Sequence, residues 1–174
     1  MPETKPLHLT IGARGARRLL DWLWASRPGA ALLARTMHWL DRAALRLTNG
    51  RTTVAGLVTG LPVVTLTTTG ARSGASRSVP TLAIPDGAEF WLIASNWGQR
   101  RYPAWYFNLR HNPRCRIAVQ GGSAEYVAHE VTDEADYDWR WQRAVALYRG
   151  FASYRHRAAP RHIPILVLRP FTDS

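Results

Sequence analysis

The chain has 174 residues, 46% of them hydrophobic, which fits one compact domain that buries most of its apolar surface. Its hydrophobic stretches are too short for a transmembrane helix, and its N-terminus lacks the apolar run of a secretory signal, so we expect a cytoplasmic protein. The formal charge of +11 comes almost entirely from arginine and would attract phosphates, carboxylates, anionic lipid or nucleic acid, so the charge leaves the partner open, although no nucleic-acid-binding motif accompanies it.

The first part of the chain has the periodicity of helices. Residues 14–47 divide into two segments at Pro28 and Gly29, and the first segment mixes arginine with leucine and tryptophan. Such a segment could lie on the cytoplasmic face of an anionic membrane, or pack on the rest of the protein or on a second subunit. The sequence leaves these alternatives and the oligomeric state open. We predict a helical extension over 1–50 and one β-rich unit over 51–174.

After residue 51 the pattern changes to short β-branched and aromatic runs bounded by Gly, Pro and Asp. Turn residues at 85–87 and 121–123 separate successive runs at hairpin distance, so both pairs are predicted to be antiparallel hairpins. The predicted strands cover 63–68, 77–84, 90–95, 116–120, 126–131 and 163–168. The fold class is therefore α+β, mainly β, with about six antiparallel strands in a small barrel.

Two helices interrupt the predicted strands. A short helix is expected over 103–111, because proline favours the first position of a helix and Asn112 with Pro113 ends it. A longer helix is expected over 133–148, before the last strand. Thr132 is its predicted N-cap, and acidic residues in its first turn favour the positive end of the helix dipole.

The segment 67–80 leaves one predicted strand, turns, and enters the next. It carries two glycines, several hydroxyl side chains and the arginines Arg72 and Arg77 around the turn. Exposed backbone N–H groups, hydroxyls and guanidinium forks all bind phosphate, so the turn predicts an anion site. It is not a P-loop, because the lysine is absent and a strand follows, and a plain basic hairpin would have the same composition.

A second segment, 95–108, joins a strand end to the short predicted helix and is dense in aromatic residues. Trp105, Tyr106 and Asn108 could wall a flat heterocycle and hydrogen-bond it. In the alternative interpretation the aromatic side chains belong to the core and Asn108 ends the helix. The six histidines have no metal-ligand spacing, so no metal site is predicted.

Together, the two segments resemble the paired signatures of the deazaflavin-dependent nitroreductase family. The resemblance covers about residues 63–170. It consists of Leu-Thr-Thr-Thr-Gly-x-x-Ser-Gly-x-x-Arg at 66–77, Pro-x-Trp-Tyr-x-Asn-Leu at 103–109, Asn-Pro at 112–113, Thr-Asp-Glu at 132–134 and Ile-Pro-Ile at 163–165. Members of that family are split β-barrels that bind coenzyme F420. The resemblance therefore implies a reductase that transfers hydride from reduced F420 to a quinone, a nitro compound or an activated enone.

The resemblance also implies where the cofactor lies. By position, the turn would face the phosphate and the start of the glutamate tail, and the aromatic segment would face the deazaflavin ring. The residues so assigned are Ala71, Arg72, Ser73, Arg77, Ser78, Pro80, Thr81, Ser95, Asn96, Trp105, Tyr106 and Asn108. The family commonly has a basic residue at position 71 and Lys-Gly-Gly at 96–98. We hypothesise that Arg100 and Arg101 compensate for these two missing cations.

On the acceptor side, the resemblance points to residues 148–154. Tyr148 and Tyr154 are expected to donate hydrogen bonds to negative charge developing on the acceptor, and Phe151 to stack against it. The nitroreductase branch of the family has a tyrosine where this chain has Phe151. The predicted catalytic residues are thus Tyr148, Tyr154 and Ser95, and the predicted substrate-binding residues are Tyr148, Phe151 and Tyr154.

Two other functions remain open at this point. One is an oxidoreductase of the same fold that uses FMN, since a fold tolerates several cofactors. The other is a non-catalytic carrier of F420 or a flavin. The spectrum of the bound cofactor distinguishes an FMN enzyme from an F420 enzyme. Turnover with an acceptor distinguishes an enzyme from a non-catalytic carrier.

Overall fold

The computed structural model describes residues 61–119 and 122–172, so the predicted N-terminal helices and their predicted membrane contact lie outside the described residues. Within these residues, seven strands form one antiparallel sheet. The strands are β1 (Val63–Thr69), β2 (Ser76–Leu82), β3 (Ile84–Asp86), β4 (Glu89–Ile93), β5 (Arg114–Val119), β6 (Gly122–Glu130) and β7 (Ile165–Pro170). The helices are α4 (Ala104–His111), α5 (Glu134–Leu147) and α6 (Gly150–Ala158), with a 3-10 turn, η1 (Asn96–Gly98).

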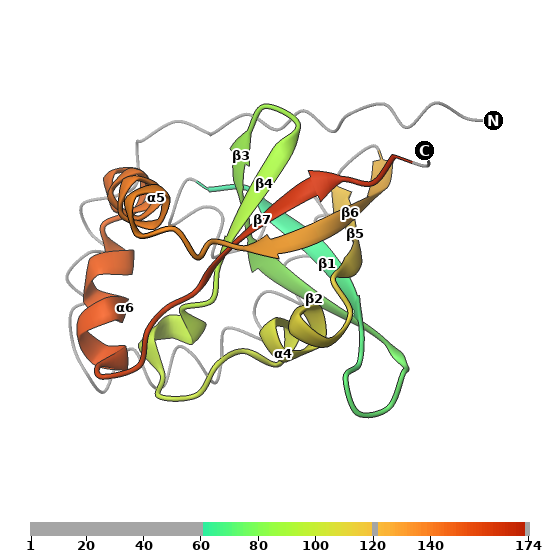
Figure 1. Cartoon of the computed structure of the whole chain (residues 1–174), viewed down its shortest axis with the longest axis horizontal. Coiled ribbons are helices and arrows are strands. Elements are labelled where there is room, and N and C mark those ends of the chain that lie inside the picture. Colours follow the sequence, from blue (N-terminus) through green and yellow to red (C-terminus); the bar gives the residue numbers. More distant parts are fainter. Residues whose placement is uncertain (1–60, 120–121, 173–174) are drawn as a thin grey trace, which may run out of the picture.

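The sheet curls into a half-barrel (Figure 1). Its strand order is β2-β1-β5-β6-β7-β4-β3, so β2 and β3 occupy opposite edges although only Ala83 separates them in sequence. The two edges must therefore approach each other at Ala83, whose N–H donates to the Pro62 carbonyl at 3.0 Å. The predicted α+β class and the antiparallel barrel are confirmed. The predicted strand 77–84 is wrong in detail, because the chain changes its strand partner from β1 to β4 at this point.

Both predicted hairpins are confirmed. In the first, Ile84 pairs with Trp91 across a turn at Gly87, and in the second, Arg114 of β5 pairs with Val127 of β6. Gly87 has a φ of +61°, a left-handed conformation that glycine adopts without a steric penalty.

The long predicted helix ends close to where it was expected, but its cap differs. The side chain of Asp133, rather than Thr132, accepts a hydrogen bond from the Asp136 N–H at 2.8 Å and caps α5. The helix α6 was not predicted. It has no side-chain cap, and its first residue is Gly150, so the usual start signals are absent. None of the helices in the described part of the chain is long and apolar enough to cross a bilayer.

The core is divided between the two faces of β4 and β7. Phe90 and Leu92 pack in one cluster with Trp105 of α4, whereas Trp91 and Ile93 pack in a second cluster with α5 and α6. Figure 1 shows α5 and α6 together on one side of the sheet and α4 separately. Strands covered on both faces carry continuous apolar runs, as these do, and each fully buried large side chain contributes roughly 1.5–3 kcal/mol. The groove described below lies where the two clusters meet.

The lone Cys115 is a buried member of the α4-side cluster, as predicted. Burial, which is the largest cause, raises the pKa of its thiol to about 12. A thiol with such a pKa stays protonated near neutral pH and is a poor nucleophile.

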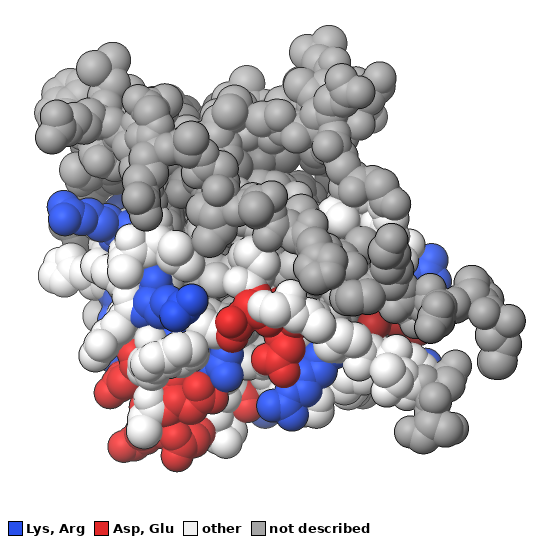
Figure 2. Space-filling model, turned by 90° about the horizontal axis from the view of Figure 1, so that it is seen from above, with Lys and Arg blue, Asp and Glu red and all other residues white. Residues whose placement is uncertain are grey.

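Surface charge on the described part of the chain is mixed. Several arginines are paired with carboxylates: Arg140 contacts Asp136 at 2.7 Å and Arg169 contacts Glu89 at 3.1 Å. On the face seen in Figure 2, acidic side chains gather beside arginines. The net positive charge is therefore not spread as one continuous basic surface over that face.

Candidate cofactor and acceptor site

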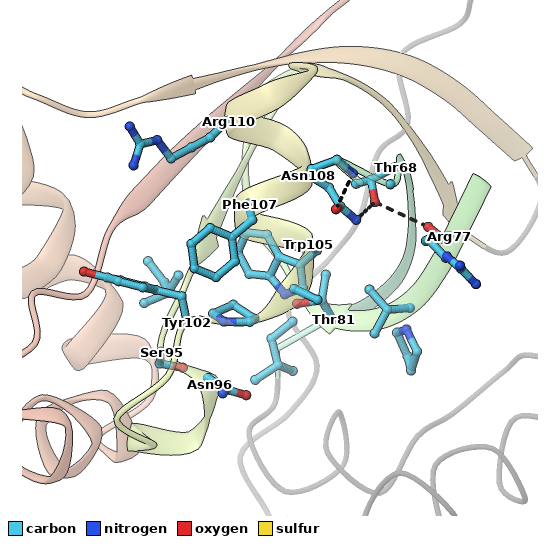
Figure 3. A pocket seen from close by; sticks show the side chains of 18 of the residues that line it. Thr68, Arg77, Thr81, Ser95, Asn96, Tyr102, Trp105, Phe107, Asn108 and Arg110 are labelled. Atoms are coloured by element: carbon cyan, nitrogen blue, oxygen red, sulfur yellow. Dashed lines mark hydrogen bonds between the residues drawn. The ribbon is translucent and has the colours of Figure 1, made fainter. Parts of the chain in front are cut away.

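An open groove with a volume of about 1170 Å³ is lined by residues of β1, β2, α4, η1 and α6. Single small-molecule sites usually occupy 300–1,000 Å³, so this groove has room for a large cofactor and a second molecule. Figure 3 shows its organisation: Thr68 and Arg77 lie at one end, Ser95 and Asn96 lie at the other, and aromatic side chains lie between them.

The first end of the groove is the turn between β1 and β2. Its backbone is closed by hydrogen bonds from the Gly70 N–H to the Ala75 carbonyl and from the Gly74 N–H to the Gly70 carbonyl, both at 2.8 Å. Gly74 has a φ of +64°, which favours glycine. The exposed residues Arg72 and Ser73 lie inside this turn and line the groove.

The arginines at this end are available to a ligand. Among the described residues, no carboxylate pairs with Arg72 or Arg77 and no side-chain hydrogen bond engages their guanidinium groups, unlike Arg140 and Arg169. Two free guanidinium forks beside a tight turn form an anion site in which each charge-assisted hydrogen bond is stronger than a neutral one.

Asn108 of α4 fixes the position of this turn. Its Oδ1 accepts a hydrogen bond from the Ala71 N–H at 3.0 Å, and its Nδ2 donates to Thr68 Oγ1 at 3.0 Å. Thr68 Oγ1 in turn donates to the Arg77 carbonyl at 3.5 Å, and the chain of bonds is drawn in Figure 3. Both functions of the Asn108 amide, and the N–H of Ala71, are therefore engaged within the protein.

Removal of this amide should weaken the anion site without removing any charge. We expect Asn108→Ala to lower the affinity for an anionic ligand of this turn, such as the F420 that the sequence resemblance implies, by about tenfold, because one lost pair of hydrogen bonds leaves the Ala71 N–H unsatisfied and the turn less ordered. Asn112→Ala is the matched control, since Asn112, the C-cap of the same helix, accepts at Oδ1 from the Arg114 N–H and does not line the groove. Fluorescence titration of F420 measures both, and equal affinities of the two variants would contradict the role given to Asn108.

The middle of the groove is aromatic. Tyr102, Trp105 and Phe107 line it, with Trp105 buried and Phe107 50% exposed. The Tyr102 and Phe107 rings lie perpendicular to each other with centroids 5.9 Å apart. Such flat apolar surfaces suit a planar heterocycle.

The other end is the loop that contains η1. Three consecutive residues, Asn96, Trp97 and Gly98, have φ values of +46°, +59° and +76°. Non-glycine residues in this region cost about 1 kcal/mol or more, so tertiary contacts must hold the loop in place. Asn96 Nδ2 donates to the Arg101 carbonyl at 2.9 Å, whereas the Ser95 hydroxyl has no hydrogen-bond partner among the described residues and lines the groove.

Gly98 is required by close packing as well as by its φ. A Cβ at this position would lie 2.9 Å from the Tyr154 carbonyl oxygen and 3.0 Å from the Tyr154 Cα, both backbone atoms of α6. At Gly87, which also has a positive φ, a Cβ would meet no atom within 4 Å.

These two glycines give a matched test of the packing between the loop and α6. We expect Gly87→Ala to lower the free energy of unfolding by about 1 kcal/mol, the cost of the left-handed conformation alone. Gly98→Ala should cost at least about 2 kcal/mol more, because backbone must also move to accommodate the Cβ. Urea unfolding measures the difference, and similar losses for both variants would contradict the close approach of η1 and α6.

The helix α6 completes the wall beside this loop. Phe151 and Tyr154 line the groove, and the Tyr154 hydroxyl lies 3.1 Å from the Tyr148 hydroxyl. Burial first, and then the neighbouring Tyr148, raise the pKa of Tyr154, so its hydroxyl stays protonated through the neutral range. Tyr148 lies behind Tyr154, outside the groove lining. Its ring covers Gly150, where any Cβ would overlap it.

The groove gathers most of the residues that the sequence assigns to the site, but three do not line it. The Ser78 Oγ instead lies 2.8 Å from Thr67 Oγ1 of the neighbouring strand β1. The Tyr106 hydroxyl donates to Glu130 at 3.0 Å, and burial with this contact raises the pKa of Tyr106 to about 12. Tyr148 is the third. The residues that do line the groove are Ala71, Arg72, Ser73, Arg77, Pro80, Thr81, Ser95, Asn96, Trp105, Asn108, Phe151 and Tyr154.

Other residues line the groove that the sequence did not single out, among them Trp97, Tyr102, Phe107 and Arg110. Helical spacing could have found part of them, because positions 104, 107, 108 and 111 lie on one face of α4. Arg100 and Arg101, which were expected to compensate for missing cations, are not among the lining residues. In the described part of the chain, no group of His, Cys, Asp and Glu side chains could hold a metal ion.

A curled antiparallel sheet with free arginines at one end of an aromatic groove and hydroxyl groups at the other defines a split-barrel protein that binds a flat, anionic cofactor. The sequence model of the family described as F420H(2)-dependent quinone reductase matches residues 39–170, and the chain belongs to this family. It is an oxidoreductase that uses reduced coenzyme F420 to reduce quinone-type acceptors.

Individual relatives agree with the family. An F420H(2)-dependent quinone reductase of Mycobacterium tuberculosis is 32% identical over 148 residues, which cover 83% of this chain and 95% of the relative. A solved F420-H2 dependent reductase, FDR-A, is 32% identical with a TM-score of 0.55 over 62% of this chain and 94% of its own. A second structure, described as a domain-swapped dimer, is 29% identical with a TM-score of 0.56 over 75% and 97%. The comparisons give the FMN alternative no support.

The residues present fit the family's cofactor. F420 carries a phosphate and a glutamate tail, and the β1–β2 turn offers the unpaired guanidinium groups of Arg72 and Arg77. Its planar ring system matches the aromatic middle of the groove, and the volume exceeds what one small ligand needs.

Proposed function

We propose that F420 lies lengthwise in the groove, with its phosphate at the β1–β2 turn and its deazaflavin ring beside the loop at η1. Arg72, Ser73 and Arg77 hold the phosphate and the first glutamate. Tyr102 and Trp105 pack against the ring, and the free Ser95 hydroxyl hydrogen-bonds its polar edge. The observation that supports this orientation is that Arg72 and Arg77, two of the three arginines that line the groove, lie at the β1–β2 turn, whereas the aromatic residues and the Ser95 hydroxyl lie toward the other end.

We propose that the quinone enters between the ring and α6. Phe151 and Trp97 provide an apolar contact for it, and Tyr154, on the same helix as Phe151, places a buried hydroxyl residue in the lining. When bound, reduced F420 supplies the hydride, and a quinone that gains this hydride and one proton leaves as the hydroquinone. The chain's own task is to exclude water, orient the acceptor and deliver the proton.

Tyr154 is the proposed proton donor. Its raised pKa keeps the hydroxyl protonated, and the hydroxyl can donate to the acceptor oxygen while accepting a hydrogen bond from Tyr148. In this arrangement Tyr148 is not a contact of the acceptor. It orients the Tyr154 hydroxyl and donates a hydrogen bond to the phenolate oxygen left when the proton is transferred, and solvent restores that proton after each turnover.

The experiment that tests the function is turnover with a defined acceptor. Purified protein is mixed with reduced F420 and menadione while the absorbance of oxidised F420 is recorded, with reduced FMN in a parallel reaction. The proposal expects saturable, enzyme-dependent oxidation of F420H2 and, under anaerobic conditions, no oxidation of reduced FMN above its spontaneous rate with menadione. Nitro compounds and activated enones are tested as further acceptors, and a higher kcat/KM for either of them would overturn the choice of a quinone.

A further inference from the structure

Arg161 lies between α6 and β7 and binds the backbone of the loop that forms one end of the groove. Its Nη2 donates to the Ser95 carbonyl at 2.7 Å and to the Gln99 carbonyl at 2.8 Å. Its Nε donates to the Gln99 carbonyl at 3.0 Å, and its Nη1 donates to the Ala94 carbonyl at 3.1 Å. One guanidinium group therefore clamps the loop on both sides of η1.

The same side chain connects the loop to the two other walls of the groove. The guanidinium lies over the Tyr102 ring, 4.7 Å from its centroid. The backbone N–H of Arg161 donates to the Ala158 carbonyl at the end of α6, the helix that carries Tyr154. Arg161 therefore contacts the backbone of Ser95, the ring of Tyr102 and the end of α6, the helix that carries Tyr154.

The loop needs such a clamp. Asn96, Trp97 and Gly98 hold consecutive left-handed conformations, which are unfavourable for the first two residues. A second arginine, Arg157, supports the loop from α6 by donating from Nη2 to the Trp97 carbonyl at 3.2 Å. Carbonyl groups fixed by arginine leave the loop with one arrangement, and the position of the Ser95 hydroxyl depends on that arrangement.

The contacts also explain why the residue is arginine. Among the described residues, no carboxylate pairs with Arg161, so its charge is balanced by carbonyl dipoles and the Tyr102 ring. A planar guanidinium offers five N–H groups in a fixed fork and can stack on a ring at the same time. Lysine has the same charge but a point-like ammonium, and it cannot make these contacts together.

We propose that Arg161 is a positioning residue for the reduction of the acceptor: it sets the distance between the Ser95–Tyr102 side of the groove and the Tyr154 side without touching either ligand. Arg161 is not among the residues that line the groove. The inference rests on the proposed position of the deazaflavin ring. Because small errors in position slow a reaction more than they weaken binding, Arg161 should affect kcat more than cofactor affinity.

The test compares Arg161→Lys with Arg169→Lys, a control in which an exposed arginine that contacts Glu89 outside the groove also exchanges its guanidinium for an ammonium group. We expect Arg161→Lys to lower kcat for menadione by about tenfold or more while the dissociation constant of F420 changes by less than about threefold. Both values are normalised to the concentration of folded protein, which is taken from the amplitude of each variant's thermal melting transition. The control should keep both within about twofold.

Chemical rescue provides a second measurement that does not depend on the lysine variant. In Arg161→Ala, added ethylguanidinium should restore a large part of kcat, and ethylammonium should not, because only the former has the planar fork. Three outcomes would overturn the proposal. The first is equal kcat values for Arg161→Lys and Arg169→Lys, and the second is a loss of kcat in Arg161→Lys that weaker F420 binding fully explains. The third is unfolding of both Arg161 variants that ethylguanidinium does not reverse.

The outcome separates this inference from the proposed function. If Arg72→Ala with Arg77→Ala leaves F420 binding intact, the proposed orientation of the cofactor fails, whatever Arg161 does. If that double variant loses F420 but Arg161→Lys behaves like Arg169→Lys, the orientation stands and only the role of Arg161 fails.

Discussion

Replacing both Arg72 and Arg77 by alanine is expected to weaken F420 binding by at least about 100-fold, since each charge-assisted hydrogen bond is worth roughly 1.5–3 kcal/mol. These arginines have no protein partner among the described residues, so their loss should leave the fold unchanged. The binding constant of the double variant should also depend less on salt, because two charges that attract the phosphate are absent.

The matched control removes the same charge elsewhere. Arg114 and Arg116 are exposed on β5, contact Glu125 at 3.7 and 3.2 Å, and do not line the groove. The double variant Arg114→Ala with Arg116→Ala lowers the net charge by the same two units and should bind F420 within about threefold of the wild type. A comparable loss in both double variants would mean that F420 responds to the total charge and has no site at the β1–β2 turn.

Tyr154→Phe is expected to lower kcat by about 100-fold while F420 affinity changes little, since the removed hydroxyl is the proposed proton donor. Tyr148→Phe should have a smaller effect, because its hydroxyl contacts Tyr154 rather than the groove. The control is Tyr106→Phe, because the Tyr106 hydroxyl binds Glu130 outside the groove. Steady-state kinetics with menadione measure all three, and a Tyr154→Phe enzyme as active as Tyr106→Phe would assign the proton to water.

The direction of the Tyr154 pKa shift adds a pH test of the same residue. Burial disfavours the charged phenolate and raises the pKa of Tyr154, so the proton-donating form persists above the usual tyrosine range near pH 10. Between pH 7 and about 10, kcat should therefore show no decline that requires the Tyr154 hydroxyl. A decline in this range that disappears in Tyr154→Phe would show that Tyr154 ionises normally.

Local sequence signals predicted the scaffold well. The β3–β4 and β5–β6 hairpins have turn residues at the expected spacing, and α4 begins after Pro103 and ends before Asn112. The β1–β2 turn was recognisable as a candidate anion site because glycines, hydroxyls and arginines lie within a few residues of one another. What short-range patterns could not give was the change of partner at Ala83, which depends on closure of the whole sheet.

The direction of individual side chains was predicted less well, although the periodicity of the elements contains it. Trp105 and Asn108 are three residues apart on α4 and share a face, whereas Tyr106 is turned by about 100° and reaches Glu130 instead. On β2, Arg77 and Thr81 alternate with Ser78, which contacts Thr67 and does not line the groove, but Pro80 lines it although it has the parity of Ser78, so strand alternation sorts these residues only in part.

The part of the site furthest from prediction is α6 and the arginine that follows it. Gly150 and an uncapped first turn give no helix signal, so Tyr154 could be placed only by resemblance. Arg161 binds backbone carbonyls of a loop about 60 residues away in the sequence. Every residue has a backbone carbonyl, so the amino-acid sequence does not show which carbonyls an arginine binds. Residues of this kind are found only when the fold is known.

The measurement that tests the central claim most directly is a thermodynamic cycle of two ligands and two proteins. F420 and its deazaflavin riboside, which lacks the phosphate and the glutamates, are each titrated into the wild type and into the Arg72→Ala with Arg77→Ala variant. The account predicts that F420 binds the wild type at least about 100-fold more tightly than it binds the variant, while the riboside binds both within about threefold. Equal losses for the two ligands would contradict the placement of the phosphate at the β1–β2 turn, and with it the orientation of F420 in the groove.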